Sequence, residues 1–188
     1  MDTAIDTEKC AITHYSWLYR FLHWGMAFLV LSAIALIELK DFMPDRSLRY
    51  DIGFLHIQAG LLVFFLIWAR LLWRMSNRVP PICPPLTPMH KLAASFTHFA
   101  LYFMMVATPL LGILSLQSKG KAVVLFGFPL PVFVDQDKWL SYALSIKNYH
   151  ELLGNILIGL IVLHVASAIM HHMLRRDDTL RRILPWLK

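Results

Sequence analysis

The chain has 188 residues, of which 57% are hydrophobic and 16% charged, and its formal net charge is +6. Soluble domains of this size are about half apolar and about a quarter charged, so the composition excludes an ordinary soluble protein and favours one membrane domain over residues 1–188. The positive charge does not indicate nucleic-acid binding, because basic residues flank the helices of most inner-membrane proteins.

Four apolar runs are long enough to cross a bilayer as helices, which takes about 20 residues. We predict these spans at residues 17–37, 52–73, 92–116 and 149–173. The sequence therefore predicts an all-α integral membrane four-helix bundle.

The connections between the predicted spans differ in character. A short charged segment follows the first span, and the proline-rich linker RVPPICPPLTP follows the second. Prolines lack a backbone donor, so an extended linker is expected there. The longest connection, residues 117–148, has the apolar centre VVLFGFPLPVF, which prolines interrupt before it could span. We expect a loop or a short hairpin lying against the membrane surface.

The basic residues predict the orientation. Four spans place both termini on one side, which we call side A, and the opposite side is side B. Side A holds eleven of the lysines and arginines and side B holds seven. Basic residues near helix ends favour the cytoplasm, so both termini are expected there, and in a bacterium side B would be the periplasm.

Histidines within the spans are the strongest functional signal. His150 and His164 lie 14 residues apart in the fourth span, which places them nearly on one helix face and about 21 Å apart along the axis. Ionisable side chains inside a membrane are costly and usually functional. Two imidazoles at two depths suggest two buried prosthetic groups, one above the other.

Depth in the membrane pairs these histidines with two others. The spans alternate in direction, so His56 lies at the depth of His150 near side B, and His23 lies at the depth of His164 nearer side A. Facing imidazoles on two helices can provide the two axial ligands of a haem iron, and bundle interiors commonly host such sites. The chain lacks C-x-x-C-H, which excludes covalent haem attachment.

Other residues near these pairs are candidates for supporting roles. Glycines lie beside His56 and His150 on their helix faces and would leave room for a flat porphyrin. At the depth of side A, haem propionates could pair with Arg20, Arg70 and Arg74. His98 in the third span is either a competing axial ligand or a hydrogen-bonding group near the side A cofactor, and we favour the second role. His171 shares a face with His164 and is either interfacial or part of a substrate pocket.

The chain resembles the bacterial di-haem cytochrome b561 family along nearly its whole length. The resemblance is carried by SWLYRFLHW, FLHIQAG, NYHELLGN, GLIVLHVASAIMHH and the DDTL tail. It implies two b-type haems in a four-helix bundle, with His23, His56, His150 and His164 as axial ligands of the iron. It also implies electron exchange with ubiquinone and, in one branch of the family, oxidation of superoxide.

Three functions compete on the sequence. The first is an inner-membrane oxidoreductase that moves electrons from a small periplasmic donor, superoxide among the candidates, to ubiquinone, with His98 and His171 as candidate quinone ligands. The second is an electron-transfer subunit docked to a separate dehydrogenase or periplasmic carrier. The third is a transporter that uses its histidines for protons or a transition metal, although carboxylates are scarce in the spans.

Overall fold

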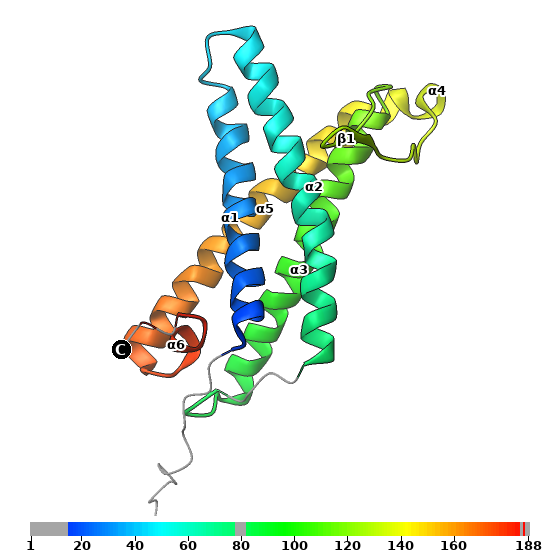
Figure 1. Ribbon diagram of the computed structural model, residues 1–188. Coiled ribbons are helices and arrows are strands. Elements are labelled where there is room, and N and C mark those ends of the chain that lie inside the picture. The colour runs from blue at the N-terminus through cyan, green and yellow to red at the C-terminus, as the bar shows by residue number, and fades with distance from the viewer. Residues whose placement is uncertain (1–14, 78–81, 185, 187–188) are drawn as a thin grey trace, which may run out of the picture.

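The structure is a computed structural model that describes residues 15–77, 82–184 and 186. Within this part of the chain, four long helices form the molecule: α1 (Trp17–Lys40), α2 (Arg46–Ser76), α3 (Pro88–Gln117) and α5 (Ala143–Met170). All four are long and apolar enough to cross a membrane, which confirms the predicted all-α class with four helices able to span. The helices α1 and α2 form one antiparallel pair, and α3 and α5 form a second pair that crosses it (Figure 1).

Most helix ends lie beyond the apolar runs that predicted them, but α1 begins at the predicted residue and α5 ends at Met170, before the predicted residue 173. Helix α2 begins six residues before the predicted span, where Asp45 accepts a hydrogen bond from the Ser47 amide and caps the helix. Helix α3 begins at Pro88, with Thr87 as its cap. Apolar composition marks only the segment that lies in lipid, whereas the capping residues Asp45 and Thr87 mark where α2 and α3 begin.

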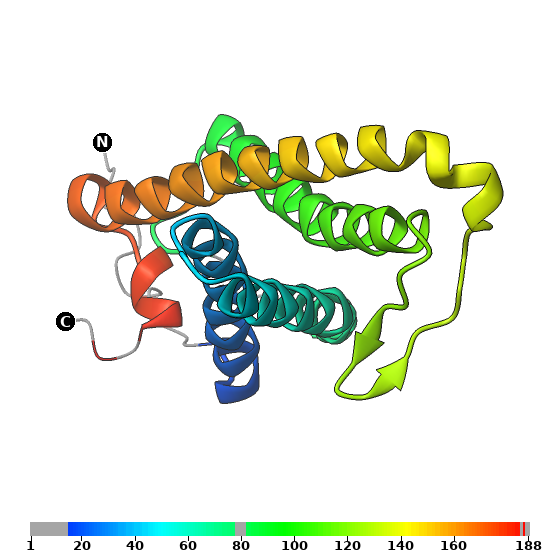
Figure 2. The same cartoon turned by 90° about the horizontal axis from the view of Figure 1, so that it is seen from above.

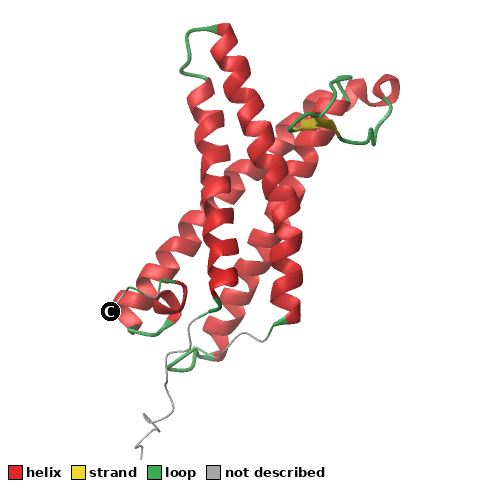
Figure 3. Cartoon of the chain, in the orientation of Figure 1, coloured by secondary structure: helices red, strands yellow, loops and turns green. Residues whose placement is uncertain are grey.

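The connection between α3 and α5 contains a small hairpin, which was one of the two structures predicted for it, the other being a loop. Strands β1 (Val124–Leu125) and β2 (Phe128–Pro129) pair antiparallel, and the short helices α4 (Gln136–Trp139) and η2 (Leu140–Tyr142) follow (Figure 3). The turn between the strands uses positive φ at Phe126 (47°) and Gly127 (92°). Glycine adopts such a φ readily and phenylalanine does not, so Phe126 must be held there by its surroundings.

Two buried glutamines hold this hairpin on the bundle. The Gln58 amide donates to the Val124 carbonyl (2.7 Å) and accepts from the Phe126 amide (2.9 Å). Gln117 makes the same double contact with Pro131 (2.7 Å) and Phe133 (2.9 Å). Each side chain therefore satisfies both its own polar ends and two backbone groups, as burial demands.

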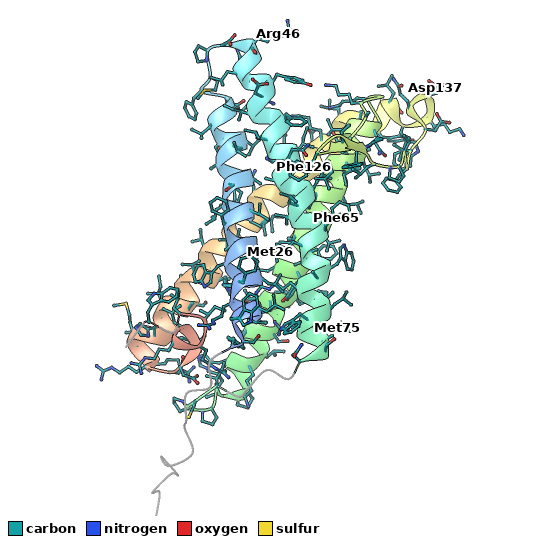
Figure 4. The ribbon with its side chains drawn as sticks, viewed as in Figure 1. Met26, Arg46, Phe65, Met75, Phe126 and Asp137 are labelled. Atoms are coloured by element: carbon teal, nitrogen blue, oxygen red, sulfur yellow. The ribbon has the colours of Figure 1, made fainter. Side chains whose placement is uncertain are left out.

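The C-terminal segment closes the opposite end of the bundle. After α5 the chain continues as a π-helical turn, η3 (His171–Arg175), and a short helix, α6 (Thr179–Ile183). Figure 2 shows α6 folded back from the end of α5 toward α1, and the Trp24 indole donates to the Ile183 carbonyl (3.3 Å). This end is side A, and the end with the α1–α2 turn and the hairpin is side B. Figure 4 shows this placement, with Arg46 and Asp137 toward side B and Met75 at side A.

A buried apolar layer occupies the middle of the bundle. All four long helices contribute to it, and its members are Met26, Val30, Val63, Ile67, Leu101, Met105 and Leu157. On α1, α3 and α5 these residues lie between a site histidine and a second histidine or a histidine-binding carbonyl, and on α2 they lie between His56 and Arg70. The outer faces also carry large exposed apolar side chains, such as Phe28 (71%) and Phe65 (48%), as expected for surfaces in contact with lipid. The apolar layer therefore separates two polar regions at two depths.

Candidate functional site

The side B histidines, His56 on α2 and His150 on α5, face each other. Their ring centroids are 6.1 Å apart and the rings are nearly perpendicular (86°). Two imidazoles that bind one metal from opposite sides have centroids about 6 Å apart, because each coordinating nitrogen lies about 2 Å from the metal. The separation therefore fits one iron between the two rings.

The hydrogen bonds of this pair define which ring nitrogen is available. The Nδ1 atom of His56 donates to the Ala33 carbonyl (2.8 Å), and Nδ1 of His150 donates to the Thr108 carbonyl (2.8 Å). A carbonyl oxygen can only accept, so each Nδ1 carries the proton and each Nε2 keeps its lone pair. This is the arrangement typical of metal-binding histidines, whose second nitrogen is held by a backbone carbonyl or carboxylate.

Glycines shape the space around the side B pair. A Cβ atom at Gly112 would lie 3.1 Å from Cε1 and 3.2 Å from Nδ1 of His150, so only glycine lets this ring lie against α3 without a shift. A Cβ at Gly60 or Gly154 would meet nothing within 4 Å among the described residues. Open space beside both histidines is consistent with the room that a porphyrin needs.

At side A, His164 on α5 lies between two other histidines. Its ring centroid is 6.4 Å from that of His23 on α1 and 5.6 Å from that of His98 on α3. The first separation fits an iron between the rings as well as the side B pair does. His98 is thus at the side A centre, as its depth in the sequence predicted, and the structure leaves both of its predicted roles open.

Arginines and a tyrosine surround the side A group. Nη2 of Arg70 donates to Nδ1 of His23 (2.8 Å), and the Arg70 guanidinium also lies over the rings of Tyr19 and Tyr102 (5.8 and 5.7 Å). The Arg74 guanidinium also lies over the Tyr102 ring, 5.7 Å from its centroid. Within the described residues, the buried Nε of Arg70 and the hydroxyl of Tyr102 have no hydrogen-bond partner. Such unpaired donors are suited to bind the carboxylates of a buried ligand.

Arg20 lies apart from Arg70 and Arg74. It lines a cavity of about 330 Å³ between α1 and the C-terminal segment, whose walls are mostly aromatic. The other lining residues are Trp17, Phe21, Trp24, Gly25, Ile183 and Trp186. Of the three arginines that the sequence singled out, the structure thus brings two to the side A histidines.

His171 lies at the side A end of α5 and forms a polar cluster of its own. Its Nδ1 is 2.6 Å from Oδ2 of Asp177, whose side chain is 1% exposed. Burial alone would raise the pKa of Asp177, but hydrogen bonds from His171 and Thr179 outweigh it and hold the pKa below its usual value. Asp177 was not among the residues predicted from the sequence, although its place just beyond the last helical turn was a signal that could have identified it.

The residues that the sequence predicted as axial ligands therefore meet in two pairs at two depths. Their spacing, the free Nε2 atoms at side B and the unpaired donors at side A all fit two haem groups. Sequence reasoning did not identify Gly112 or the carbonyls of Ala33 and Thr108, because backbone acceptors and close approaches depend on how the helices cross.

Comparisons with known proteins agree with this architecture. The family model for prokaryotic cytochrome b561 matches residues 14–186. The chain is 33% identical over 171 residues to the probable superoxide oxidase CybB of Yersinia pestis, which covers 91% of this chain and 96% of the relative. It is 36% identical over 166 residues to cytochrome b561 homolog 1 of Escherichia coli K12 (88% and 93%) and 30% identical over 165 residues to homolog 2 (86% of each).

These matches cover nearly all of the helical bundle and both histidine pairs, and they confirm the resemblance seen in the sequence. The chain belongs to the prokaryotic cytochrome b561 family and is a multi-pass protein of the bacterial inner membrane that serves b-type haem electron transport.

Proposed function

We propose that the chain binds two haem b groups, one between His56 and His150 and the other between His23 and His164. The observation that supports this most directly is that both pairs have a centroid separation suited to one iron, 6.1 and 6.4 Å. The haems, when bound, supply reversible one-electron chemistry at two depths of the membrane. At side B backbone carbonyls hold the rings and fix their tautomer, and at side A arginines set the charge around the rings.

Side B is the proposed entrance for the electron donor, with superoxide as the candidate. Four lysines lie at this end, two in the loop after α3, one on α4 and one in the first turns of α5. Two of them are paired: Lys138 with Asp135 (3.3 Å) and Lys147 with Glu151. Lys119 and Lys121 have no acidic partner among the described residues, so their charge is available to a small anion. Positive charge near an entrance raises the association rate of an anion in a salt-dependent way. The name of the Yersinia relative supports superoxide as the donor.

Side A is the proposed exit to ubiquinone. His98 and His171 are the proposed hydrogen-bond donors to the quinone carbonyls, because one touches the ring of His164 and the other lies two turns further along the same helix face. Arg70 and Arg74 are the proposed partners of the side A propionates, with Arg20 further out on α1. The majority of basic residues supports placing side A in the cytoplasm.

A second candidate function is an electron-transfer subunit that docks to a periplasmic redox protein. The hairpin region favours it, because Phe126, Phe128 and Phe133 are 64%, 78% and 60% exposed at side B. Exposed apolar patches are typical of interaction sites, although contact with lipid would also cover them. Copurification of a redox partner that the hairpin variant Phe128→Ser releases would favour this function over the free-standing oxidoreductase.

The test is stopped-flow reduction of the haems by a superoxide pulse in right-side-out and inverted vesicles, with and without ubiquinone. We expect reduction in right-side-out vesicles, and a decrease of roughly three- to ten-fold at low salt in Lys119→Gln/Lys121→Gln. The matched control is Lys138→Gln, which removes a charge that Asp135 already neutralises. Reduction no faster than the uncatalysed background would exclude superoxide, and faster reduction in inverted vesicles would reverse the orientation.

A further inference from the structure

Three ionisable side chains from three segments meet at side A, beyond the histidine layer. His90 lies in the first turn of α3, His171 begins η3, and Asp177 lies between η3 and α6. The rings of His90 and His171 are 6.2 Å apart and nearly perpendicular, and Nδ1 of His171 is 2.6 Å from the Asp177 carboxylate. The cluster therefore forms a short series from an exposed histidine to a partly buried histidine and a buried carboxylate.

Hydrogen bonds assign a separate task to each nitrogen in this series. The Thr87 hydroxyl lies 2.5 Å from Nδ1 of His90, which leaves Nε2 of this exposed residue to exchange protons with water. Asp177 occupies Nδ1 of His171, which leaves its Nε2 as the atom that can meet a ligand. The side chain of His171 is 12% exposed, so protons reach it mainly through its neighbours.

The carboxylate is held in its ionised form. Asp177 accepts hydrogen bonds from His171 and from the Thr179 amide (3.0 Å), and its pKa lies below the usual value despite burial. An ionised carboxylate on one ring nitrogen stabilises a positive charge on the imidazole and fixes the direction of the ring. The neighbouring acid, Asp178, differs because it pairs with Arg182 (3.6 Å) and accepts from the Cys83 amide (2.9 Å).

We propose that His171 is the proton donor for quinone reduction, that Asp177 is its positioning residue, and that His90 restores its proton from the solvent of side A. This inference rests on the proposed reduction of quinone at side A. Quinol formation takes two electrons, supplied by the donor oxidised at side B, and two protons, and it converts each quinone carbonyl to a hydroxyl. His171 gives a proton from Nε2 and becomes neutral imidazole, and His90, through one water or a ring rotation, restores it for the second transfer.

A purely structural role predicts different results. Asp177 also accepts from the Thr179 amide at the start of α6, so it helps to hold the C-terminal segment regardless of any proton. If that were its whole contribution, Asp177→Asn would resemble Asp178→Asn, because each change removes one charge from the same turn. The two aspartates therefore form a matched pair of sites for substitution.

The experiment measures quinone-dependent haem reoxidation in the purified holoprotein, with short-chain ubiquinone as the probe. We expect Asp177→Asn and His171→Ala to slow it by more than ten-fold while the oxidised and reduced haem spectra stay unchanged, and His90→Gln to slow it by about three-fold. Asp178→Asn should stay within two-fold of the wild type. Added imidazole should restore much of the rate in His171→Ala, which a structural defect would not allow.

Two further measurements distinguish a failure of the proton-transfer proposal from a failure of the proposed quinone reduction. The wild-type rate should fall about two-fold or more in D₂O, and a pH-indicator dye should report proton uptake from side A. If the wild type reduces quinone but Asp177→Asn matches Asp178→Asn, or the D₂O effect is absent, the proton role is wrong and the quinone function stands. If the wild type does not reduce quinone, both fail. Should Asp177→Asn lose haem, His90→Gln and the D₂O effect decide the question.

Discussion

The two histidine pairs are held by different means. At side B, the backbone fixes both rings: each Nδ1 donates to a carbonyl of a neighbouring helix, and Gly112 admits the ring of His150. At side A, side chains do this work: Arg70 donates to Nδ1 of His23, and His98 lies against His164. The first pair has its proton on Nδ1 and its Nε2 free, whereas the second is surrounded by arginine and histidine side chains.

The difference concerns which nitrogen is free. With Arg70 donating to Nδ1, a neutral His23 carries its proton on Nε2, the atom that would have to bind the iron. An iron held by Nε2 of His23 would require the proton on Nδ1, the atom to which Arg70 donates in this structure. The rings of side B already carry the proton on Nδ1, so the two pairs differ in the tautomer that their contacts favour.

The largest expected effect comes from removing an axial ligand. His56→Ala or His150→Ala should lower the haem content from about two per chain to about one, and the remaining haem should be the same one in both variants. His23→Ala and His164→Ala should remove the other. Haem quantification with a redox titration of each variant distinguishes the two groups by their potentials.

His98→Leu is the control for this assignment, because His98 is even closer to His164 than His23 is. We expect this variant to keep both haems, with changes confined to side A. Loss of a haem in His98→Leu together with retention in His23→Ala would transfer the axial role to His98 and break the proposed symmetry between the two pairs.

A change of intermediate size tests how rigidly side B is built. In Gly112→Ala the added methyl would lie 3.1 Å from Cε1 of His150, so the ring must shift and its bond to Thr108 must lengthen. Overpacking of this kind typically costs about 1–3 kcal/mol. We expect the side B haem to dissociate at lower temperature while the side A haem is unaffected, as followed by absorbance on heating. Gly159→Ala is the matched control, because this glycine is exposed on α5 and nothing lies within 4 Å of an added Cβ.

The sequence predicts those features of the molecule that depend on residues close together in the chain, and it does not predict those that depend on contacts between distant segments. The spans and the depths of His23, His56, His150 and His164 follow from helix rise and apolar length, so chain position alone suffices. The contacts that other helices make with these histidines cannot be predicted from chain position. Whether the Thr108 carbonyl or Gly112 meets His150 depends on the crossing of α3 and α5, which no local pattern encodes.

The same limit explains two other features that the sequence did not reveal. Gln58 and Gln117 were polar residues in or near apolar runs, but their pairing with the hairpin depends on contacts 66 and 14 residues away. Arg20 was grouped with Arg70 and Arg74 by depth alone, yet its position around the α1 axis directs it to the aromatic cavity at the C-terminal segment. The sequence predicts the depth of a residue in the membrane more easily than the direction in which its side chain points.

The smallest expected effect is a change in the redox potential of one haem when a single charge is removed at side A. Arg70→Gln removes the guanidinium beside His23 but keeps a side chain that can hydrogen-bond, so both haems should remain bound. Loss of this positive charge destabilises the reduced haem, but by less than the loss of an axial ligand would. If the guanidinium stabilises the reduced haem by about 1 kcal/mol, its loss corresponds to roughly 40 mV for a one-electron couple. We expect the side A potential to fall by about that amount and the side B potential to stay within about 10 mV, because the apolar layer around Met26 and Leu157 separates the two. Lys91→Gln, an exposed charge on side A, should leave both potentials unchanged. Equal shifts at both haems in Arg70→Gln would show that the two centres share one electrostatic environment, contrary to the comparison drawn from their contacts.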